Sequence, residues 1–313
     1  MQQISFSELA YTHKKKTTRK ERFLAEMNDL LPWKHLLKPI VRKYPKPGNG
    51  RRPIPPEVML RIYFMQQWYG LSDPAMEDSL YDVESMRRFA GVDLDHIPDE
   101  TTICKFRHFL ERHRLTEALF RRTEQYLSER GLLLSEGTIV DATIVPAPSS
   151  TKNRARQRDP EMGSTRKGTR WFFGLKAHVG SDPQGRVHSA VVTSASVHDS
   201  EIMEDCVHGA EEVIYGDKAY VSAERQQQAE SDEVEWRVLR KASRGRRLNC
   251  ADRSFNTKSN RVRARVEHAF GVIKHLWGYR KVRYRGLAKN AAQIFTLFAL
   301  ANYYLARHEL RST

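Results

Sequence analysis

The sequence is short of cysteine and of long apolar runs. Three cysteines, Cys104, Cys206 and Cys250, are scattered over 313 residues, which gives neither a disulfide framework nor a zinc-binding spacing. We expect them to be small buried side chains in a reducing compartment. The longest apolar stretch, residues 294–305, falls short of the roughly 20 residues that a membrane-spanning helix requires, and the first residues lack the apolar core of a signal peptide. These shortages argue against a disulfide-rich secreted protein and against a membrane-spanning one.

Acidic residues are outnumbered by basic ones. The chain has 53 Lys and Arg against 38 Asp and Glu, a net charge of +15. Such an excess favours a polyanionic partner, either nucleic acid or an anionic membrane surface. Hydrophobic residues make up 40% of the chain, which is enough for a folded protein with substantial cores. Because no membrane segment is expected, nucleic acid is the better candidate partner.

Two segments concentrate the positive charge. Residues 151–171 carry seven Lys or Arg, and residues 240–289 carry sixteen against only two acids, Asp252 and Glu267. A run of like charge is usually a hydrated surface. Hydration does not explain why a single glutamate, Glu267, lies among so many lysines and arginines. Both segments are therefore candidate DNA-contacting loops.

The first 130 residues are predicted to be helical. One predicted helix follows Pro55 and Pro56 and ends at Gly70, which is the preferred placement of both residue types. Ser72 and Asp99 are predicted N-caps of two further helices, residues 72–81 and 99–112. Apolar residues recur at helical spacing in two stripes: Phe23, Met27, Leu30 and Leu31, and Val58, Ile62, Met65 and Tyr69.

From Gly131 onward the pattern predicts strands. Five short segments are rich in β-branched or aromatic residues: 138–145, 173–179, 186–194, 212–215 and 235–239. Helical stretches follow the third segment (200–207) and the fourth (223–229). Three strands in a meander, followed by strands alternating with helices, indicate a mixed α/β sheet.

Two aspartates stand out in this region. Asp141 interrupts an apolar β-branched strand, where an unpaired buried carboxylate is costly. Asp217 follows the apolar strand 213–215 across Gly216, and ligand sites in α/β sheets occur at such carboxyl ends of strands. A structural salt bridge would explain either acid alone.

Glu267 favours a site over two separate salt bridges. A helix is predicted over residues 258–277, with Val262, Val266, Ala269, Ile273 and Leu276 as its core-facing stripe. Arg263, Glu267 and Lys274 lie four and then seven residues apart, so they share a second stripe beside the apolar one. The helix therefore presents one acid between two cations on the same face.

Together these residues predict a metal-dependent active site in a basic cleft. The oxygens of Asp141, Asp217 and Glu267 suit Mg²⁺, which completes its shell with water and phosphate. Two such ions about 3.5–4 Å apart activate the attacking oxygen and stabilise the leaving one in phosphoryl transfer. We expect two Mg²⁺ ions, with Mn²⁺ as a substitute. His178, His268 and Asp199 are weaker candidates, because core, phosphate-contacting or N-cap roles explain them equally well.

The sequence resembles the DDE transposases of the bacterial insertion sequence 5 family over nearly its whole length. The resemblance implies an RNase H-like catalytic domain in which Asp141, Asp217 and Glu267 are the catalytic acids. It also places Arg263 and Lys274 on a Tyr-Arg-Glu-Lys signature, although the tyrosine position is Asn260 here. The motifs that carry it are 45–52 (PKPGNGRR), 71–78 (LSDPAMED), 99–103 (DETTI), 140–144 (VDATI), 147–153 (APSSTKN), 158–162 (RDPEM), 173–178 (FGLKAH) and 263–268 (RARVEH).

The implied function is DNA transposition: binding of terminal inverted repeats, metal-dependent cleavage of the ends and joining of 3′-OH ends to target DNA. The implied domains are a helical, helix-turn-helix-like DNA-binding domain (1–130), an RNase H-like catalytic domain (131–290) and a C-terminal helix packed on it (291–313). We expect at least a homodimer on paired ends, in the bacterial cytoplasm at the nucleoid. Two alternatives remain open, a metal-dependent nuclease of the same fold and a catalytically silent DNA-binding regulator.

Specific DNA contacts are expected from the helix 99–112, from the basic run near residue 14 and from the two basic segments described above. The helix 99–112 presents a polar face with Thr101, Lys105, His108 and Arg112 at i, i+4, i+7 and i+11, and the basic run near residue 14 is a candidate phosphate clamp. The expected contacts are Lys14, Lys15, Lys16, Arg51, Arg52, Thr101, Lys105, Lys152, Arg154, Arg166, Lys167, Lys218, Arg244, Arg246, Arg247, Arg261 and Arg265.

Overall fold

The computed structural model describes residues 14–49, 52–152, 154, 156–242 and 247–312. Up to Ser128, the described residues form helices joined by short loops, as predicted. These helices are α2 (Arg19–Leu30), α3 (Trp33–Val41), α4 (Pro56–Tyr69), α5 (Asp73–Asp82), α6 (Glu84–Ala90), α7 (Glu100–Arg112) and α8 (Leu115–Ser128), with a 3₁₀ turn at Leu94–His96.

The predicted helix ends are confirmed. Ser72 accepts a hydrogen bond from the Ala75 amide at the start of α5, and Asp99 accepts one from the Thr102 amide at 2.6 Å at the start of α7. Gly70 ends α4 at a φ of +67°, which glycine adopts without the penalty of a Cβ. Local chemistry therefore fixes where these helices start and stop.

Six strands form one mixed sheet. The order is β2-β3-β1-β5-β6, and β4 pairs with β3. Strand β1 is antiparallel to β3 and parallel to β5, which confirms the predicted mixed α/β sheet. The strands are β1 (Gly137–Pro146), β2 (Gly163–Lys167), β3 (Arg170–Ser181), β4 (Val187–Ser194), β5 (Val213–Gly216) and β6 (Glu235–Val238).

Strand β2 lies in residues 151–171, for which the sequence predicts a basic loop and no strand. Its sequence, Gly-Ser-Thr-Arg-Lys, has no apolar alternation, and it joins the sheet through backbone pairing with β3. The predicted helix 200–207 is also wrong. Two 3₁₀ turns, Asp199–Ile202 and Glu204–Cys206, occupy that segment, and helix α9 (Ala223–Ser231) follows later as predicted.

The helix that carries Glu267 is not continuous. Helix α10 (Cys250–Arg263) starts earlier than predicted and stops before Ala264, and α11 (Val266–Gly271) runs into a π-helical turn at Val272–Leu276. The π turn shifts the register of its last residue, so Leu276, predicted to face the core, is 54% exposed. Cys250 also departs from its prediction, because it is exposed at the start of α10, whereas Cys206 is buried.

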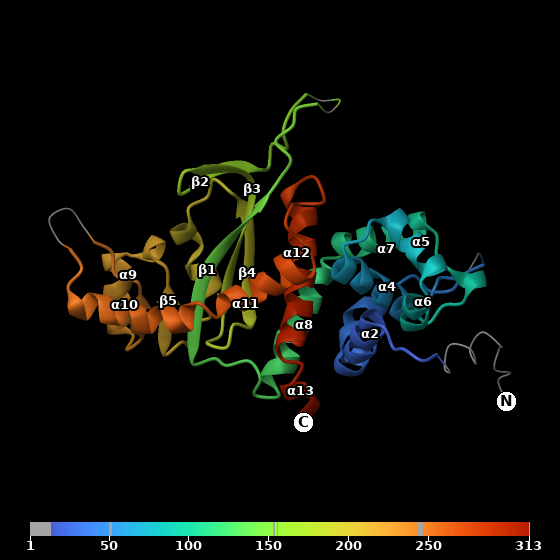
Figure 1. Cartoon of the computed structure of the whole chain (residues 1–313), viewed down its shortest axis with the longest axis horizontal. Coiled ribbons are helices and arrows are strands. Elements are labelled where there is room, and N and C mark those ends of the chain that lie inside the picture. Colours follow the sequence, from blue (N-terminus) through green and yellow to red (C-terminus); the bar gives the residue numbers. More distant parts are fainter. Residues whose placement is uncertain (1–13, 50–51, 153, 155, 243–246, 313) are drawn as a thin grey trace.

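Helix α12 (Leu287–Leu305) lies between the sheet and the helical region, and the short α13 (Glu309–Ser312) follows it (Figure 1). Its apolar run is buried on both sides, against α8 and against β4. The buried Asn302 side chain bonds the backbone N and O of Val187 in β4, at 2.8 and 2.6 Å. Among the described residues, no helix is long and apolar enough to cross a membrane.

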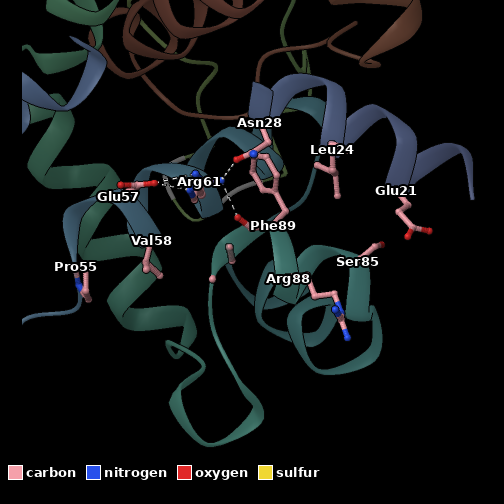
Figure 2. Close-up of a pocket in the computed structure, with 13 residues that line it drawn as sticks. Glu21, Leu24, Asn28, Pro55, Glu57, Val58, Arg61, Ser85, Arg88 and Phe89 are labelled. Atoms are coloured by element: carbon pink, nitrogen blue, oxygen red, sulfur yellow. Dashed lines mark hydrogen bonds and ion pairs between the residues drawn. The ribbon is translucent and has the colours of Figure 1, made fainter. Parts of the chain in front are cut away.

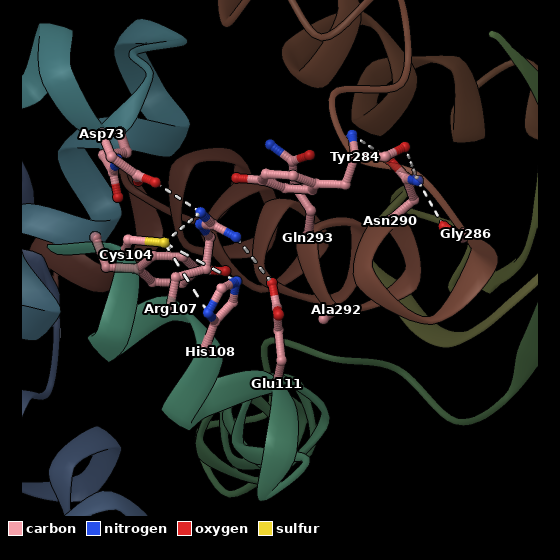
Figure 3. Close-up of polar contacts among 12 residues, drawn as sticks. Asp73, Cys104, Arg107, His108, Glu111, Tyr284, Gly286, Asn290, Ala292 and Gln293 are labelled. Carbon is pink, nitrogen blue, oxygen red and sulfur yellow. Dashed lines mark hydrogen bonds and ion pairs between the residues drawn. The ribbon is translucent and has the colours of Figure 1, made fainter. Parts of the chain in front are cut away.

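A polar seam joins the helical region to the segment before α12 (Figure 3). Arg107 of α7 is buried, donates to Asp73 at 2.6 Å and to Glu111 at 3.4 Å, and lies 4.6 Å from the ring centre of Tyr284. Asn290 in turn bonds the backbone of Tyr284. One continuous hydrophobic core runs from Leu24 to Ala306 and includes residues of α7 and of the sheet. This shared core holds α7 in position relative to the sheet.

Candidate active site

Asp141 lies in the middle of β1, and its cross-strand partner in β3 is Val179. Its side chain is 15% exposed. One carboxylate oxygen, Oδ1, accepts the Ala142 amide at 2.8 Å, and the other, Oδ2, accepts Nη1 of Arg263 at 2.7 Å. The predicted buried acid is therefore present, and an arginine from α10 compensates its charge.

The charge environment of Asp141 connects it to the other two acids. Burial raises the pKa of Asp141 to about 6, although the Arg263 guanidinium opposes the shift. The carboxylates of Glu267 and Asp217 raise this pKa further. Because like charges disfavour each other's ionised form, Asp217 and Glu267 each lie within electrostatic reach of Asp141. Their positions in sequence are far apart, so the fold brings them together.

Asp217 directly follows β5, at the carboxyl end of the strand. Gly216 pairs with Val140 in parallel register, so Asp217 follows at the level of Asp141 on the neighbouring strand. Its Oδ1 accepts the amide of Lys218 at 2.6 Å and so caps the 3₁₀ turn Lys218–Tyr220. The parallel pairing of β1 and β5 is what places the two aspartates side by side.

Tyr220 was not predicted as a neighbour of the candidate site, and it packs with Val140 and Cys206 on the face of β1 opposite to Asp141. Its side chain is 1% exposed, and its hydroxyl has no hydrogen-bond partner among the described residues. Burial raises its pKa, and the charges of Asp141, Asp199 and Asp217 raise it further.

Glu267 approaches from α11, which crosses the sheet face that carries Asp141. Its side chain is exposed, and its charge acts on the pKa of both Asp141 and Lys274. No group of three or more His, Cys, Asp or Glu side chains closes around a single point within the part of the chain that the structure describes. Carboxylate oxygens are donors that suit a hard divalent ion, but in this conformation the three carboxylates do not converge on one point, and Arg263 holds Asp141.

Arg263 is oriented by its own helix. Its Nε donates to Oδ1 of Asn260 at 3.2 Å while Nη1 reaches Asp141. Asn260 stands where the resembling families carry tyrosine. The amide oxygen thus supplies a contact that orients the arginine, a role that the sequence comparison left open.

Lys274 also reaches β1. Its Nζ donates to the Thr143 hydroxyl at 2.6 Å and to the Ile144 carbonyl at 2.7 Å. Burial lowers its pKa, and the positive charge of Lys167 lowers it further. The predicted common stripe therefore exists in a modified form: Arg263 and Lys274 both attach the helical segment to β1 on either side of Glu267.

Two of the three weaker candidates, His178 and Asp199, pair with other residues than the three acids. His178 pairs with Ala142 in the sheet, so it points to the opposite face from Asp141. It bonds Thr193 at 2.9 Å, and burial lowers its pKa to about 4. Asp199 forms an ion pair with Lys176 at 2.8 Å. Among these candidates only the exposed His268 is on the helix of Glu267.

Most predicted DNA contacts that the structure describes are exposed. Lys14 instead lies half-buried in an ion pair with Glu21, and the exposed Arg265 donates to the Pro183 carbonyl at 2.7 Å. Arg51, Arg244 and Arg246 lie outside the described residues. The exposed ones are Lys15, Lys16, Arg52, Thr101, Lys105, Lys152, Arg154, Arg166, Lys167, Lys218, Arg247 and Arg261.

Two hollows lie away from the acids. One, of about 540 Å³, opens between α2, α4 and α6, where Arg61 bonds Glu57, Asn28 and the Phe89 carbonyl (Figure 2). The other, of about 230 Å³, is lined by Arg158, Arg283 and Arg285. Neither contains a predicted catalytic residue.

The segment 158–162 has a structural role that the sequence did not indicate. Asp159 accepts the Gly286 amide and Glu161 the Leu287 amide, both at 2.7 Å, at the start of α12. Carboxylates are favoured at this end of a helix, where amides lack partners. These contacts attach the loop after β1 to the helix that spans the core.

A mixed sheet with two aspartates on adjacent parallel strands and a glutamate on a covering helix defines a class of phosphoryl-transfer enzymes that act through divalent ions. Comparisons with known proteins agree. A family model described as "Transposase DDE domain" matches residues 133–303, more than half of the chain, and one described as a transposase domain matches residues 12–109. The chain belongs to the DDE transposases.

The two matched families together are typical of insertion sequence 5-type transposases, so the predicted resemblance and the function in DNA transposition are confirmed, and the mixed α/β sheet with its helical N-terminal region agrees with the predicted fold class. A solved structure titled "Crystal structure of the Mos1 Strand Transfer Complex" is similar at 12% identity with a TM-score of 0.27, covering 85% of this chain and 81% of the other. The family acts on DNA and generally uses divalent metal ions.

Proposed function

We propose that Asp141, Asp217 and Glu267 hold two Mg²⁺ ions, which Mn²⁺ can replace, and that these ions carry the cleavage and joining of transposon ends. The observation that supports this is the position of Asp141 beside the end of β5, from which Asp217 follows, with the charges of Asp217 and Glu267 both disfavouring the ionised form of Asp141. A buried carboxylate in that position gains from a nearby divalent cation.

The bound ions would activate the attacking oxygen and stabilise the leaving one. The protein's own part is to supply and neutralise charge around them. Arg263 neutralises Asp141 before ions are present, and its guanidinium fork suits a phosphate oxygen once Asp141 is engaged elsewhere. Lys274 bonds Thr143 and Ile144 of β1. These bonds hold α11, and with it Glu267, in position relative to Asp141.

The helical region is proposed to read the terminal inverted repeats. Thr101, Lys105 and Arg112 are exposed on one face of α7, which matches a helix placed in the major groove. Exposed lysines and arginines in residues 151–171 and 240–289 would hold the phosphate backbone of the DNA near the three acids. We assign residues 1–130 to end binding and residues 131–290 to catalysis. Residues 291–313 form the C-terminal part that packs on the catalytic domain.

Joining of two ends calls for two protomers, so we propose a homodimer or larger assembly on paired ends, acting at the nucleoid in the bacterial cytoplasm. A protein that binds one end and cuts the other requires pairing before cleavage. A mixture of an end-binding-defective protein and a Glu267→Gln protein would cleave if protomers act in trans. Full-rate cleavage by one protomer on one end would contradict the proposal.

The test of the active site uses precut and uncut end duplexes that carry the repeats flanking the gene. Asp141→Asn, Asp217→Asn and Glu267→Gln keep the side-chain shape and remove the charge. Each should lose cleavage and joining in Mg²⁺ while end binding in Ca²⁺ stays within about twofold. Lys176→Gln, on the opposite sheet face, is the matched control. Retained cleavage in any amide variant would remove that residue from the site.

A further inference from the structure

The junction between α10 and α11 lies midway between two residues of the candidate site. Arg263 ends α10 two residues before Arg265, and Glu267 follows two residues after it. Two amides at this junction bond three residues back instead of four: Arg265 to Val262 at 2.9 Å and His268 to Arg265 at 3.0 Å. Such bonds wind the chain more tightly than an α-helix does. The geometry of the junction therefore sets how Glu267 lies relative to Arg263.

The turn between β3 and β4 lies directly against this junction. Nη1 of Arg265 donates to the Pro183 carbonyl at 2.7 Å. Gly185 is buried, has a φ of +88°, and lies so close to Arg265 that an added Cβ would be 2.2 Å from the Arg265 carbonyl oxygen. An ordinary contact begins at about 3.4 Å, so a side chain here would displace the turn or the junction by roughly 1 Å. Glycine permits this close approach.

The turn is firmly attached to the chain that enters β1, the strand of Asp141. Asp182 is fully buried at the start of the turn. Its Oδ1 accepts the amides of Gln184 at 2.9 Å and Arg186 at 2.8 Å, which closes the turn. Its Oδ2 accepts the amide of Leu134 at 3.2 Å, three residues before β1 begins. The turn is therefore held in place relative to β1, and the junction of α10 and α11 packs against it.

Helix α11 is thus attached to the sheet at both of its ends. Beyond its last residue, Lys274 bonds Thr143 and Ile144 of β1. Before its first residue, Arg265 bonds the β3–β4 turn. Glu267 lies between these attachments, and its exposed side chain has no hydrogen bond or ion pair within the described part of the chain. The backbone of α11 therefore determines where Glu267 lies.

We propose that Gly185 and Arg265 are positioning residues for cleavage and joining, because the β3–β4 turn sets the junction of α10 and α11 and with it the position of Glu267. Gly185 acts through its close contact with the Arg265 carbonyl, and Arg265 acts through its bond to the turn. Neither residue contacts the reacting atoms in this role. The proposal rests on the proposed function, since it names what places one of the three acids.

The test compares two glycines with similar backbones and different surroundings. Gly209 has a φ of +82° and no atom within 4 Å of an added Cβ, so Gly209→Ala carries a similar conformational penalty without the overlap. Gly185→Ala should raise the Mn²⁺ concentration that half-saturates cleavage about tenfold or more, as expected for the loss of a group that orients a metal ligand. Gly209→Ala should leave it unchanged. A general loss of stability lowers the amount of active protein and does not move this concentration.

Two further measurements do not depend on cleavage. In the metal-free protein, hydrogen–deuterium exchange of the amides of residues 264–271 should rise in Gly185→Ala and stay as in the wild type in Gly209→Ala. On end DNA, Gly185→Ala should weaken Mn²⁺ binding. In a Glu267→Gln background the same substitution should weaken it no further, because the turn acts through Glu267.

Arg265→Ala keeps the test decisive if Gly185→Ala does not fold. It removes an exposed side chain and its bond to Pro183, and it should shift the half-saturating Mn²⁺ concentration in the same direction. Arg253→Ala, which removes another exposed cation, should not shift it.

An unshifted Mn²⁺ concentration in both Gly185→Ala and Arg265→Ala would overturn the proposal. An equal rise in Gly209→Ala, or a further loss of Mn²⁺ affinity in the Glu267→Gln background, would overturn it as well. Wild-type Mn²⁺ binding by Glu267→Gln alone would contradict the proposed function instead. The exchange measurement would then still test whether the turn holds α11.

Discussion

Arg263 donates from Nη1 to Oδ2 of Asp141 across 2.7 Å, so helix α10 is joined to strand β1 at the proposed metal site. The same guanidinium is held by Asn260 at 3.2 Å. A cation supplied by the protein thus neutralises the most buried acid of the three. The arrangement implies that a divalent ion and Arg263 compete for the same carboxylate.

We therefore predict that Arg263→Ala binds Mn²⁺ more tightly than the wild type and cleaves more slowly. Affinity rises because the carboxylates lose a competing cation, and cleavage falls because a phosphate-binding group is lost. Calorimetry and single-turnover cleavage measure the two effects. Arg253→Ala, which removes an exposed cation from the same helix, should leave Mn²⁺ affinity unchanged. Weaker Mn²⁺ binding by Arg263→Ala would show that the two cations do not compete.

Asn260 should matter through Arg263 alone. Asn260→Ala removes the acceptor that orients the guanidinium, and a hydrogen bond to a charged group is worth about 1.5–3 kcal/mol, less where water reaches it. We expect cleavage to fall roughly threefold to tenfold with end binding unchanged. In an Arg263→Ala background the same substitution should have no further effect. An additive loss in the double variant would assign Asn260 a separate role.

The seam at Arg107 should contribute to stability. Arg107→Ala would leave the partly buried Asp73 without its ion pair, at a cost of roughly 3–5 kcal/mol for a buried pair. Urea unfolding measures this cost. The control is Arg121→Ala, which breaks an exposed i,i+4 pair with Glu117 and should cost at most about 0.5 kcal/mol. Equal costs in the two variants would contradict a buried role for the seam.

Buried His188 should make stability fall in acid. It lies within hydrogen-bond distance of the Thr138 and Ser189 hydroxyls, and burial lowers its pKa from 6.5 to about 4. As the pH falls below 6.5 the unfolded chain binds the proton first. Stability is therefore fully present above pH 6.5 and decreases toward pH 4, by at most roughly 3 kcal/mol at about 1.36 kcal/mol per pKa unit.

The measurement is the free energy of unfolding in urea at pH 7, 5.5 and 4.5. His188→Asn should reduce the loss between the first and last pH. His308→Asn changes an exposed histidine and should leave the loss as it is in the wild type. An unchanged slope in His188→Asn would assign the acid sensitivity to other groups.

Much of the site was predictable from local patterns. Asp141 interrupts a β-branched strand and Asp217 follows one. The caps at Ser72 and Asp99 place helix starts within a few residues. Each of these signals depends only on residues close in sequence. The face of Glu267 was also predictable from helical spacing. These inferences needed no knowledge of how distant segments meet.

The rest depended on tertiary contacts. Strand β2 has a polar sequence and exists because β3 offers it a backbone partner. The break after Arg263 and the π turn at Val272–Leu276 have no counterpart in the apolar pattern, which continues at helical spacing through both. Tyr220 needed the knowledge that β5 lies beside β1. The pairing of Arg263 with Asp141 spans 122 positions, and nothing in the sequence specifies it.

Binding of the catalytic ions by Asp141, Asp217 and Glu267 is tested by counting the Mn²⁺ ions bound per protomer on end DNA with electron paramagnetic resonance. The wild type should bind two ions. Asp141→Asn, Asp217→Asn and Glu267→Gln should each bind fewer, or bind at least about tenfold more weakly, with unchanged end binding. Wild-type stoichiometry and affinity in all three variants would contradict the account.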